Sequence, residues 1–106
     1  MARTLIGMPA RARRGEVIEV KTLIAHPMET GYRRDATGNL VKRDIIRRFA
    51  CVYGGVEVFA AELHPAIAAN PFVTFALRAE ASGPVEFRWT GDDGFAQTER
   101  VQLAVE

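Results

Sequence analysis

Apolar and polar residues alternate with a period of two along much of this chain. In the stretch 16–24, EVIEVKTLI, one face collects Ile18, Val20, Thr22 and Ile24. The same alternation recurs in 72–79, 84–90 and 100–105. Because successive side chains of a strand point to opposite faces of a sheet, this pattern predicts antiparallel strands with one buried face.

Turn-forming residues separate these stretches and indicate how the strands connect. Gly54-Gly55 predicts a tight turn between strands at 43–53 and 56–62. The run Thr90–Gly94 predicts a second hairpin, which pairs 84–90 with 95–105. The other expected features are a hairpin tip at Asp35–Asn39, an N-terminal strand near 2–8 and a helical turn at Pro65–Ala69. About seven short strands predict an all-β fold, an immunoglobulin-like antiparallel β-sandwich.

The strand at 43–53 departs from the simple pattern, because both of its faces carry apolar residues and arginines. One face is expected to hold Ile45, Arg47, Phe49, Cys51 and Tyr53, and the other Ile46, Arg48, Ala50 and Val52. A sandwich sheet normally buries one face, so the first interpretation is that another chain covers the outer face. The second interpretation is a bulge or a local twist that shifts the pattern. The sequence leaves both interpretations open.

Length and composition are those of an ordinary globular protein. With 106 residues, 48% hydrophobic and 25% charged, the chain is expected to form one domain over residues 1–106. No apolar run approaches the roughly 20 residues of a membrane helix, and Leu5–Met8 is too short for the apolar region of a signal peptide. We therefore expect no membrane association, and a cytoplasmic chain unless a partner carries it across a membrane. The single cysteine excludes an internal disulfide.

Charge is distributed unevenly along the chain, although the net charge is only +1. Residues 1–50 carry a formal charge of +6 and residues 51–106 a formal charge of −5, an asymmetry that can mark a partner surface. The basic residues are not set in an aromatic-rich RNA motif or a helix-turn-helix pattern. Nucleic acid is therefore not an expected partner.

Both histidines of the chain precede a proline and follow an apolar, strand-like run. Proline biases the residue before it toward extended or turn geometry, so His26 and His64 are expected at strand ends. Two imidazoles and the Cys51 thiolate could form a mononuclear metal site, and the alternative function is therefore a small redox protein. No H-x-H or H-x-x-H spacing supports that alternative, and we expect no cofactor.

Neither Cys51 nor the adjacent carboxylates of Asp92 and Asp93 are expected to catalyse a reaction. A reactive thiol needs access and a depressed pKa, whereas Cys51 lies mid-strand between Phe49 and Tyr53. It is expected to be a small buried hydrophobe. The two aspartates are expected at a solvated hairpin tip with their side chains pointing apart, which does not suit a catalytic pair.

Three stretches together resemble one known family. They are GEVIEVKTLIAHPMETG, RDIIRRFACVYGGVEVFAAELHPAIAANPFVTF and GPVEFRWTGDDG, and their most specific parts are His26–Gly31, Glu62–Asn70 and Trp89–Gly94. They are similar to the Z subunit of the SoxYZ sulfur-carrier complex of thiosulfate oxidation, and the likeness covers about residues 3–105. The resemblance implies an immunoglobulin-like sandwich, which agrees with the period-two pattern.

The resemblance also implies a function. In the SoxYZ complex, a cysteine on a glycine-rich C-terminal arm of the Y subunit carries sulfur intermediates between the Sox enzymes of the periplasm. The Z subunit is its tightly bound, non-catalytic partner. This chain ends in VQLAVE without a Gly-Gly-Cys-Gly-Gly tail, and Cys51 does not match the carrier position. We therefore expect the non-catalytic subunit of a heterodimer with a SoxY-like subunit, and no enzymatic activity.

The location implied by the resemblance is the periplasm. The Y subunit bears the export signal, and the Z subunit is expected to cross the membrane bound to it. Without that partner, the chain is expected to remain in the cytoplasm.

Partner contacts are assigned to two sets of residues. The apolar face of the 43–53 strand is the expected contact with the Y subunit, and the two His-Pro loops are expected to contact other Sox enzymes. The interface candidates are Ile45, Phe49, Cys51, Tyr53, His26, Met28 and His64. Replacing His26 or His64 is then expected to alter partner binding and not bound metal. In isolation the chain could homodimerise through the same face, and a self-associating adaptor is the third hypothesis.

Overall fold

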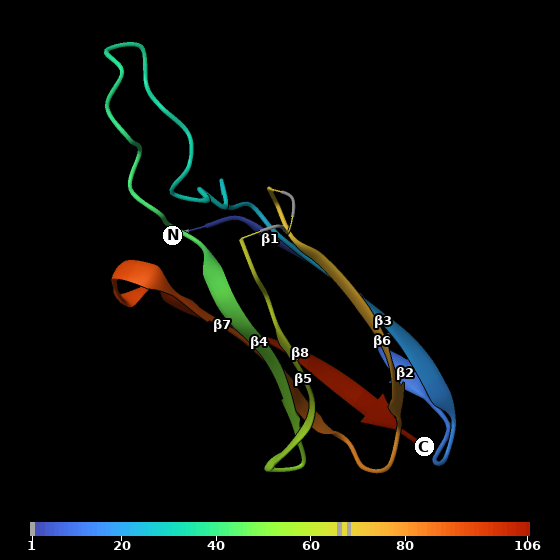
Figure 1. The fold of residues 1–106 in the computed structure, drawn as a ribbon. Helices are drawn as coiled ribbons and strands as arrows, with labels where there is room; N and C mark the ends of the chain where they lie inside the picture. Colours follow the sequence, from blue (N-terminus) through green and yellow to red (C-terminus); the bar gives the residue numbers. More distant parts are fainter. Residues whose placement is uncertain (1, 66, 68) are drawn as a thin grey trace.

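The computed structural model describes residues 2–65, 67 and 69–106, and it consists of two β-sheets packed face to face (Figure 1). The elements are β1 (Thr4–Gly7), β2 (Arg11–Ala12), β3 (Val17–Ile24), β4 (Ile46–Tyr53), β5 (Val56–Glu62), β6 (Phe72–Arg78), β7 (Gly83–Gly91), a 3-10 turn η1 (Asp92–Gly94) and β8 (Ala96–Val105). Within the described residues, no helix has the length and apolar character needed to cross a membrane.

The strand order agrees with an immunoglobulin-like sandwich. One sheet has the order β1-β3-β6, and the other has the order β2-β8-β7-β4-β5. β1 and β2 are consecutive in the chain but belong to different sheets, so this segment closes one side of the sandwich. β5 and β6 form the edges on the opposite side. The predicted fold class is confirmed. The additional strand β2 was not predicted, because two residues paired in parallel with β8 are too short to show a period.

Inward-facing residues of both sheets fill the core, as the alternation predicted. The largest fully buried side chains are Trp89, Phe49, Phe87, Ile24, Ile45, Ile46, Leu103, Val20 and Val85. At the open side, the rings of Phe59 on β5 and Phe75 on β6 stack with centroids 4.4 Å apart. This contact joins the two edge strands. Burying a large apolar side chain contributes about 1.5–3 kcal/mol, so this cluster is the main source of stability.

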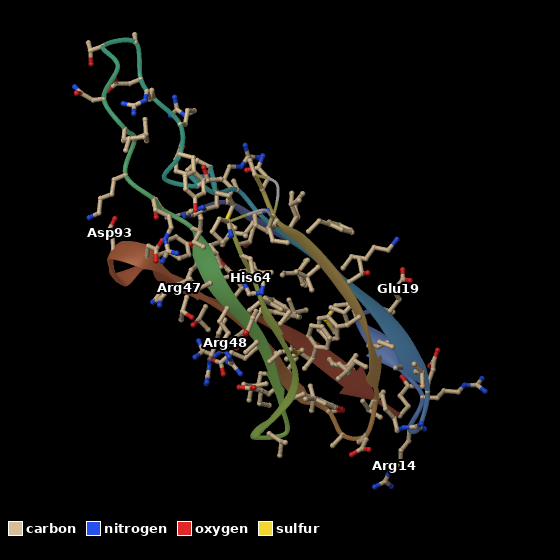
Figure 2. The ribbon with its side chains drawn as sticks, viewed as in Figure 1. Arg14, Glu19, Arg47, Arg48, His64 and Asp93 are labelled. Carbon is tan, nitrogen blue, oxygen red and sulfur yellow. The ribbon has the colours of Figure 1, made fainter. Side chains whose placement is uncertain are left out.

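A bulge in β4 explains why the 43–53 stretch has two apolar faces. The pairing of β4 with β7 changes register between Ile46 and Arg48, which makes Arg47 an extra residue. Arg47 and Arg48 are consecutive, yet both are exposed on the outer side of β4 (Figure 2). The extra residue shifts the alternation, so Ile46 before the bulge and Phe49 after it are both buried. The second of the two interpretations is therefore confirmed, and the strand begins at Ile46 rather than at 43.

Most predicted turns are present. Gly54 and Gly55 have φ values of 63° and 75°, a left-handed conformation that favours glycine, and they connect β4 to β5. The predicted β7–β8 hairpin contains the turn η1. The expected helical turn at Pro65–Ala69 includes residues 66 and 68, which lie outside the described residues. In its described part, the Ile67 N–H donates to the His64 carbonyl at 2.9 Å.

Between β3 and β4 the chain extends away from the sandwich as a long irregular hairpin, residues 29–44, which we call the arm (Figure 1). Antiparallel bridges pair Glu29 with Asp44 at its base and Arg34 with Leu40 near its tip. The tip lies at Asp35–Asn39, as predicted: the Asp35 carboxylate accepts from the N–H groups of Thr37 and Asn39 at 2.9 and 3.0 Å. With the arm, the molecule measures 58 × 21 × 19 Å.

Candidate partner-binding surfaces

The structure places the predicted β4 contact residues inside the sandwich. Phe49 and Cys51 have no exposed surface, Ile45 is 1% exposed and Tyr53 is 8% exposed. This corrects the expectation that they form an outer face for the Y subunit. Phe49, Cys51 and Tyr53 lie on the inner face of β4, and Ile45 joins the same core just before the strand begins. In this structure their side chains are part of the hydrophobic core that holds the two sheets together.

Cys51 and Tyr53 each have a clear structural role. Burial raises the pKa of the Cys51 thiol to about 12, so the thiol stays protonated and unreactive at neutral pH. The Tyr53 hydroxyl accepts hydrogen bonds from the N–H groups of Glu80 and Ala81 at 3.0 and 2.9 Å, and it donates to the Ala81 carbonyl. Tyr53 thereby fixes the connection between β6 and β7. The prediction of Cys51 as a small buried hydrophobe is confirmed.

His26 joins three segments at the base of the arm. The residue is 6% exposed, and its Nδ1 accepts a hydrogen bond from the Met28 N–H at 3.0 Å. The neutral ring therefore carries its proton on Nε2, which lies 3.7 Å from the Asp44 Oδ1. Its ring meets that of Phe95 edge to face, with centroids 5.1 Å apart. The Asn70 side chain accepts from the His26 N–H at 2.9 Å.

Met28 anchors the arm from the other side of the same motif. It is 4% exposed, and its Sδ accepts a hydrogen bond from the Ile46 N–H at 3.2 Å. Its φ of 52° is uncommon for a residue other than glycine, and the hydrogen bond to the His26 ring stabilises this turn. His26 and Met28 were predicted to contact a partner. The structure corrects this, because both side chains pack within the protein and hold the arm to β4.

Asp92 fixes the direction of the arm. Its carboxylate is only 13% exposed and accepts two hydrogen bonds from Arg43, both at 2.9 Å. It also accepts from the Ile45 N–H at 3.2 Å, and the Nε of Arg47 lies 3.4 Å away. The hydrogen bonds from Arg43 hold the pKa of Asp92 below its ordinary value. Asp92 was expected to be solvated; it instead ties the β7–β8 turn to the arm.

Asp93 adds an exposed contact at the same turn. It is labelled in Figure 2, and its carboxylate lies 2.8 Å from the Nζ of Lys42 on the arm. The two aspartates thus pair with two neighbouring basic residues of the arm. Both carboxylates are therefore engaged in holding the β7–β8 turn against the arm.

The arm presents two large exposed side chains to solvent. Tyr32 is 83% exposed and Leu40 is 57% exposed. The guanidinium of Arg33 forms an ion pair with Glu29 at 2.7 Å, and the Arg34 side chain donates to the Gly38 carbonyl at 2.7 Å. These internal contacts order the arm, so Tyr32 and Leu40 are displayed on a defined support.

His64 is the one predicted histidine contact that remains exposed. It follows the end of β5, where Figure 2 labels it. It lines a shallow depression of about 430 Å³. The charged side chains that line this depression are Arg43, Arg47, Arg48 and Glu62. Its role as a partner contact stays a prediction.

The structure does not assemble the alternative metal site. Among the described residues, no group of three His, Cys, Asp or Glu side chains is placed to hold a metal ion. Cys51 is in the core, His26 is engaged with Met28, and His64 is exposed on the surface. The three residues named for mononuclear redox chemistry are therefore not brought together.

Large apolar side chains are exposed at positions that sequence reasoning missed. They include Leu5, Val17, Tyr32, Leu40, Val56, Val58, Ile67 and Phe72. Leu5 and Phe72 lie on a sheet face where the alternation predicts polar residues. An apolar residue at such a position is the sequence feature that could have identified this exposed surface. Val56 and Val58 lie on the edge strand β5, beside a groove of about 710 Å³ between the β4–β5 turn and the β6–β7 connection.

Comparisons with solved structures define the class of this protein. Superoxide reductase (neelaredoxin) from Ignicoccus hospitalis is similar with a TM-score of 0.73 and 19% identity, covering 99% of this chain and 82% of that chain. The sulfur carrier protein SoxY from Chlorobium limicola f. thiosulfatophilum is similar with a TM-score of 0.68 and 12% identity, covering 97% and 78%. At these identities the likeness concerns the fold, so the chain is a small immunoglobulin-like sandwich protein of the type shared by these two.

The particular family follows from the sequence match. Residues 6–102 match the family of the sulphur oxidation protein SoxZ. The chain therefore belongs to the SoxZ family, which confirms the predicted resemblance. No curated protein sequence matches the chain significantly. Family membership and the fold shared with SoxY together support a subunit of a Sox sulfur-carrier complex.

Proposed function

We propose that this chain is the non-catalytic subunit of a sulfur-carrier complex, bound to a SoxY-like subunit whose cysteine carries the intermediates of thiosulfate oxidation. The observation that carries the proposal is the match to the SoxZ family over residues 6–102. The shared sandwich fold of the SoxY carrier supports it, because two similar domains can pack as a pair.

The chemistry of the chain favours the non-catalytic role. A sulfur carrier needs an accessible thiolate, whereas Cys51 is fully buried and its pKa is raised to about 12. The thiol that forms the covalent bond to sulfur is therefore assigned to the partner. This chain contributes a folded body and contact surfaces to the heterodimer, on which the other Sox enzymes act.

The proposed location of the working complex is the periplasm. In this proposal the SoxY-like subunit provides the export signal, and the present chain is exported in complex with it. Fractionation of cells that express both chains tests this: this chain is expected in the periplasmic fraction with its partner and in the cytoplasm when the partner gene is deleted. A periplasmic location in the deletion strain would contradict co-export.

Co-purification and mass spectrometry test the proposed role itself. A tagged SoxY-like subunit encoded beside this chain is expected to retain the untagged chain at a 1:1 ratio, and a tagged unrelated β-sandwich is the control. After incubation with thiosulfate and the other Sox proteins, sulfur adducts are expected on the partner's cysteine and none on Cys51. Failure to retain the chain, or an adduct on Cys51, would show that the proposal is wrong.

A further inference from the structure

Three apolar side chains form a row across the outer face of the three-stranded sheet. Leu5 of β1 is paired with Leu23 of β3, and Leu23 is paired with Phe72 of β6. Paired residues of neighbouring strands share a face about 5 Å apart. Glu19 lies four positions before Leu23 on β3, so both side chains are on the same face of the strand. Figure 2 shows Glu19 pointing away from the other sheet. The row therefore faces solvent, with Leu5 68% exposed and Phe72 59% exposed.

The outer face of the five-stranded sheet has the opposite character. There Arg48 forms an ion pair with Glu57, and Glu86 pairs with both Arg88 and Arg100 at 3.0 and 3.1 Å. Such a network of charged side chains is typical of a face that remains in water. Charged residues are depleted and aromatic residues enriched at the centres of protein interfaces. The outer face of the three-stranded sheet also carries the Lys21–Glu19 ion pair, so its apolar part is confined to the row at the Leu23 end of the sheet. That row, and not the five-stranded face, carries the features of a contact surface.

Gly7 adds an independent observation beside the row. It lies two residues after Leu5 on the same face of β1 and is paired with Lys21. A Cβ at Gly7 would meet only Lys21, with its Cβ at 3.7 Å, and its φ is not in the left-handed region. Nothing within the described chain therefore requires glycine here. Gly7 is the last residue of β1, and without a side chain there it leaves the space beside Lys21 open to an approaching chain.

We infer that this apolar row is the centre of the surface that binds the SoxY-like subunit, an inference that rests on the proposed function. Leu5 and Phe72 alone, 68% and 59% exposed, present roughly 200–250 Å² of apolar surface, about a quarter to a third of the ~800 Å² that each partner buries in a standard interface. An apolar centre of that size with a polar rim is the usual anatomy of such a contact. The partner, itself a sandwich, would pack a sheet face on the row and place its side chains over Gly7.

Three substitutions and one matched control test the inference. Leu5→Lys and Phe72→Lys place a charge in the row, and Gly7→Val fills the space beside it with a residue that favours strands. Val56→Lys is the control, because Val56 is 61% exposed on the edge strand of the other sheet. Each variant is co-expressed with the tagged SoxY-like subunit, and the dissociation constant of the purified complex is measured. Thermal unfolding of each variant alone shows that it folds.

The row variants are expected to bind at least about tenfold more weakly with midpoints of unfolding close to wild type, whereas Val56→Lys binds as wild type. Gly7→Val is the most informative of these variants, because it is expected to fold at least as stably as wild type and still bind the SoxY-like subunit weakly. If the wild-type chain binds and the row variants bind equally well, the surface is wrong while the proposed function stands. If the variants instead abolish only a homodimer of this chain, the occupant is a second copy and the inference is overturned. If the wild-type chain does not bind the SoxY-like subunit, the proposed function itself fails.

Discussion

Gly91 is the position at which one added methyl group is expected to damage the fold most. An ideal Cβ at Gly91 would lie 2.3 Å from the Ile45 carbonyl oxygen and 2.9 Å from the Ile46 Cα. Both neighbours are backbone atoms of the segment that starts β4, so no side-chain rotation can relieve the contact. Gly91 has a φ of −161°, which is ordinary extended backbone, so its backbone conformation does not itself require glycine. The glycine is required because β4 passes over it closely.

The cost of Gly91→Ala follows from these contacts. Relieving the overlap requires a backbone shift of about 1 Å, and overpacking of this kind costs about 1–3 kcal/mol. The shift also weakens the hydrogen bond from the Asp92 N–H to the Ile45 carbonyl, 2.9 Å long, which is worth about 0.5–1.5 kcal/mol. We therefore expect a loss of about 2–3 kcal/mol, which corresponds to a midpoint lower by about 10–20 °C.

Urea denaturation followed by tryptophan fluorescence measures this loss, because Trp89 is 1% exposed in the folded state. Gly7→Ala is the matched control. It introduces the same methyl group in a strand, where the new Cβ makes only ordinary contacts with Lys21, 3.7 Å from its Cβ and 3.9 Å from its carbonyl oxygen. It is therefore expected to be neutral or to stabilise by about 0.5 kcal/mol. A Gly91→Ala protein as stable as Gly7→Ala would refute the close approach of β4 to Gly91.

Two further predictions concern His26 and Cys51. His26→Ala removes the acceptor of the buried Met28 N–H, so it is expected to lower the free energy of unfolding by about 2–4 kcal/mol. His64 is exposed, and His64→Ala is expected to stay within about 0.5 kcal/mol of wild type in the same urea assay. Equal effects of the two variants would contradict the burial of His26. Native Cys51 is expected to resist a thiol-specific disulfide reagent at pH 8 and to react fully in guanidinium, because burial raises its pKa to about 12. Val56→Cys supplies an exposed comparison thiol, and fast modification of native Cys51 would be the contrary result.

The fold class could be predicted because alternation in β3, β6, β7 and β8 is a local property of each strand. Which residues of β4 face the core could not be predicted in the same way. Counting alternate residues from Ile45 to Tyr53 fails across the Arg47 bulge, and that bulge is a feature of the pairing of β4 with β7, next to the Ile46–Gly91 pair. A sequence shows each strand separately, so a contact between residues 45 positions apart leaves no local signal.

The contact surfaces were harder to predict than the fold for the same reason. The His26 ring packs against Phe95 and its N–H is bonded to Asn70, and neither residue is near His26 in the sequence. Leu5, Leu23 and Phe72 form one row only through the register of three strands. The motifs identified the SoxZ family correctly. The residue composition of those motifs did not reveal that His26 and Met28 support the arm from within.

The hydrogen bonds between Asp92 and the arm have a consequence for the thermodynamics of partner binding. A flexible segment that becomes ordered on binding loses roughly 1–2 kcal/mol of conformational entropy per residue at 25 °C. In this protein the hydrogen bonds of Asp92, Asp35 and His26 order the arm during folding of the chain itself. A partner that contacts Tyr32 or Leu40 therefore meets a preorganised surface, and the affinity of that contact is not reduced by the cost of ordering the arm.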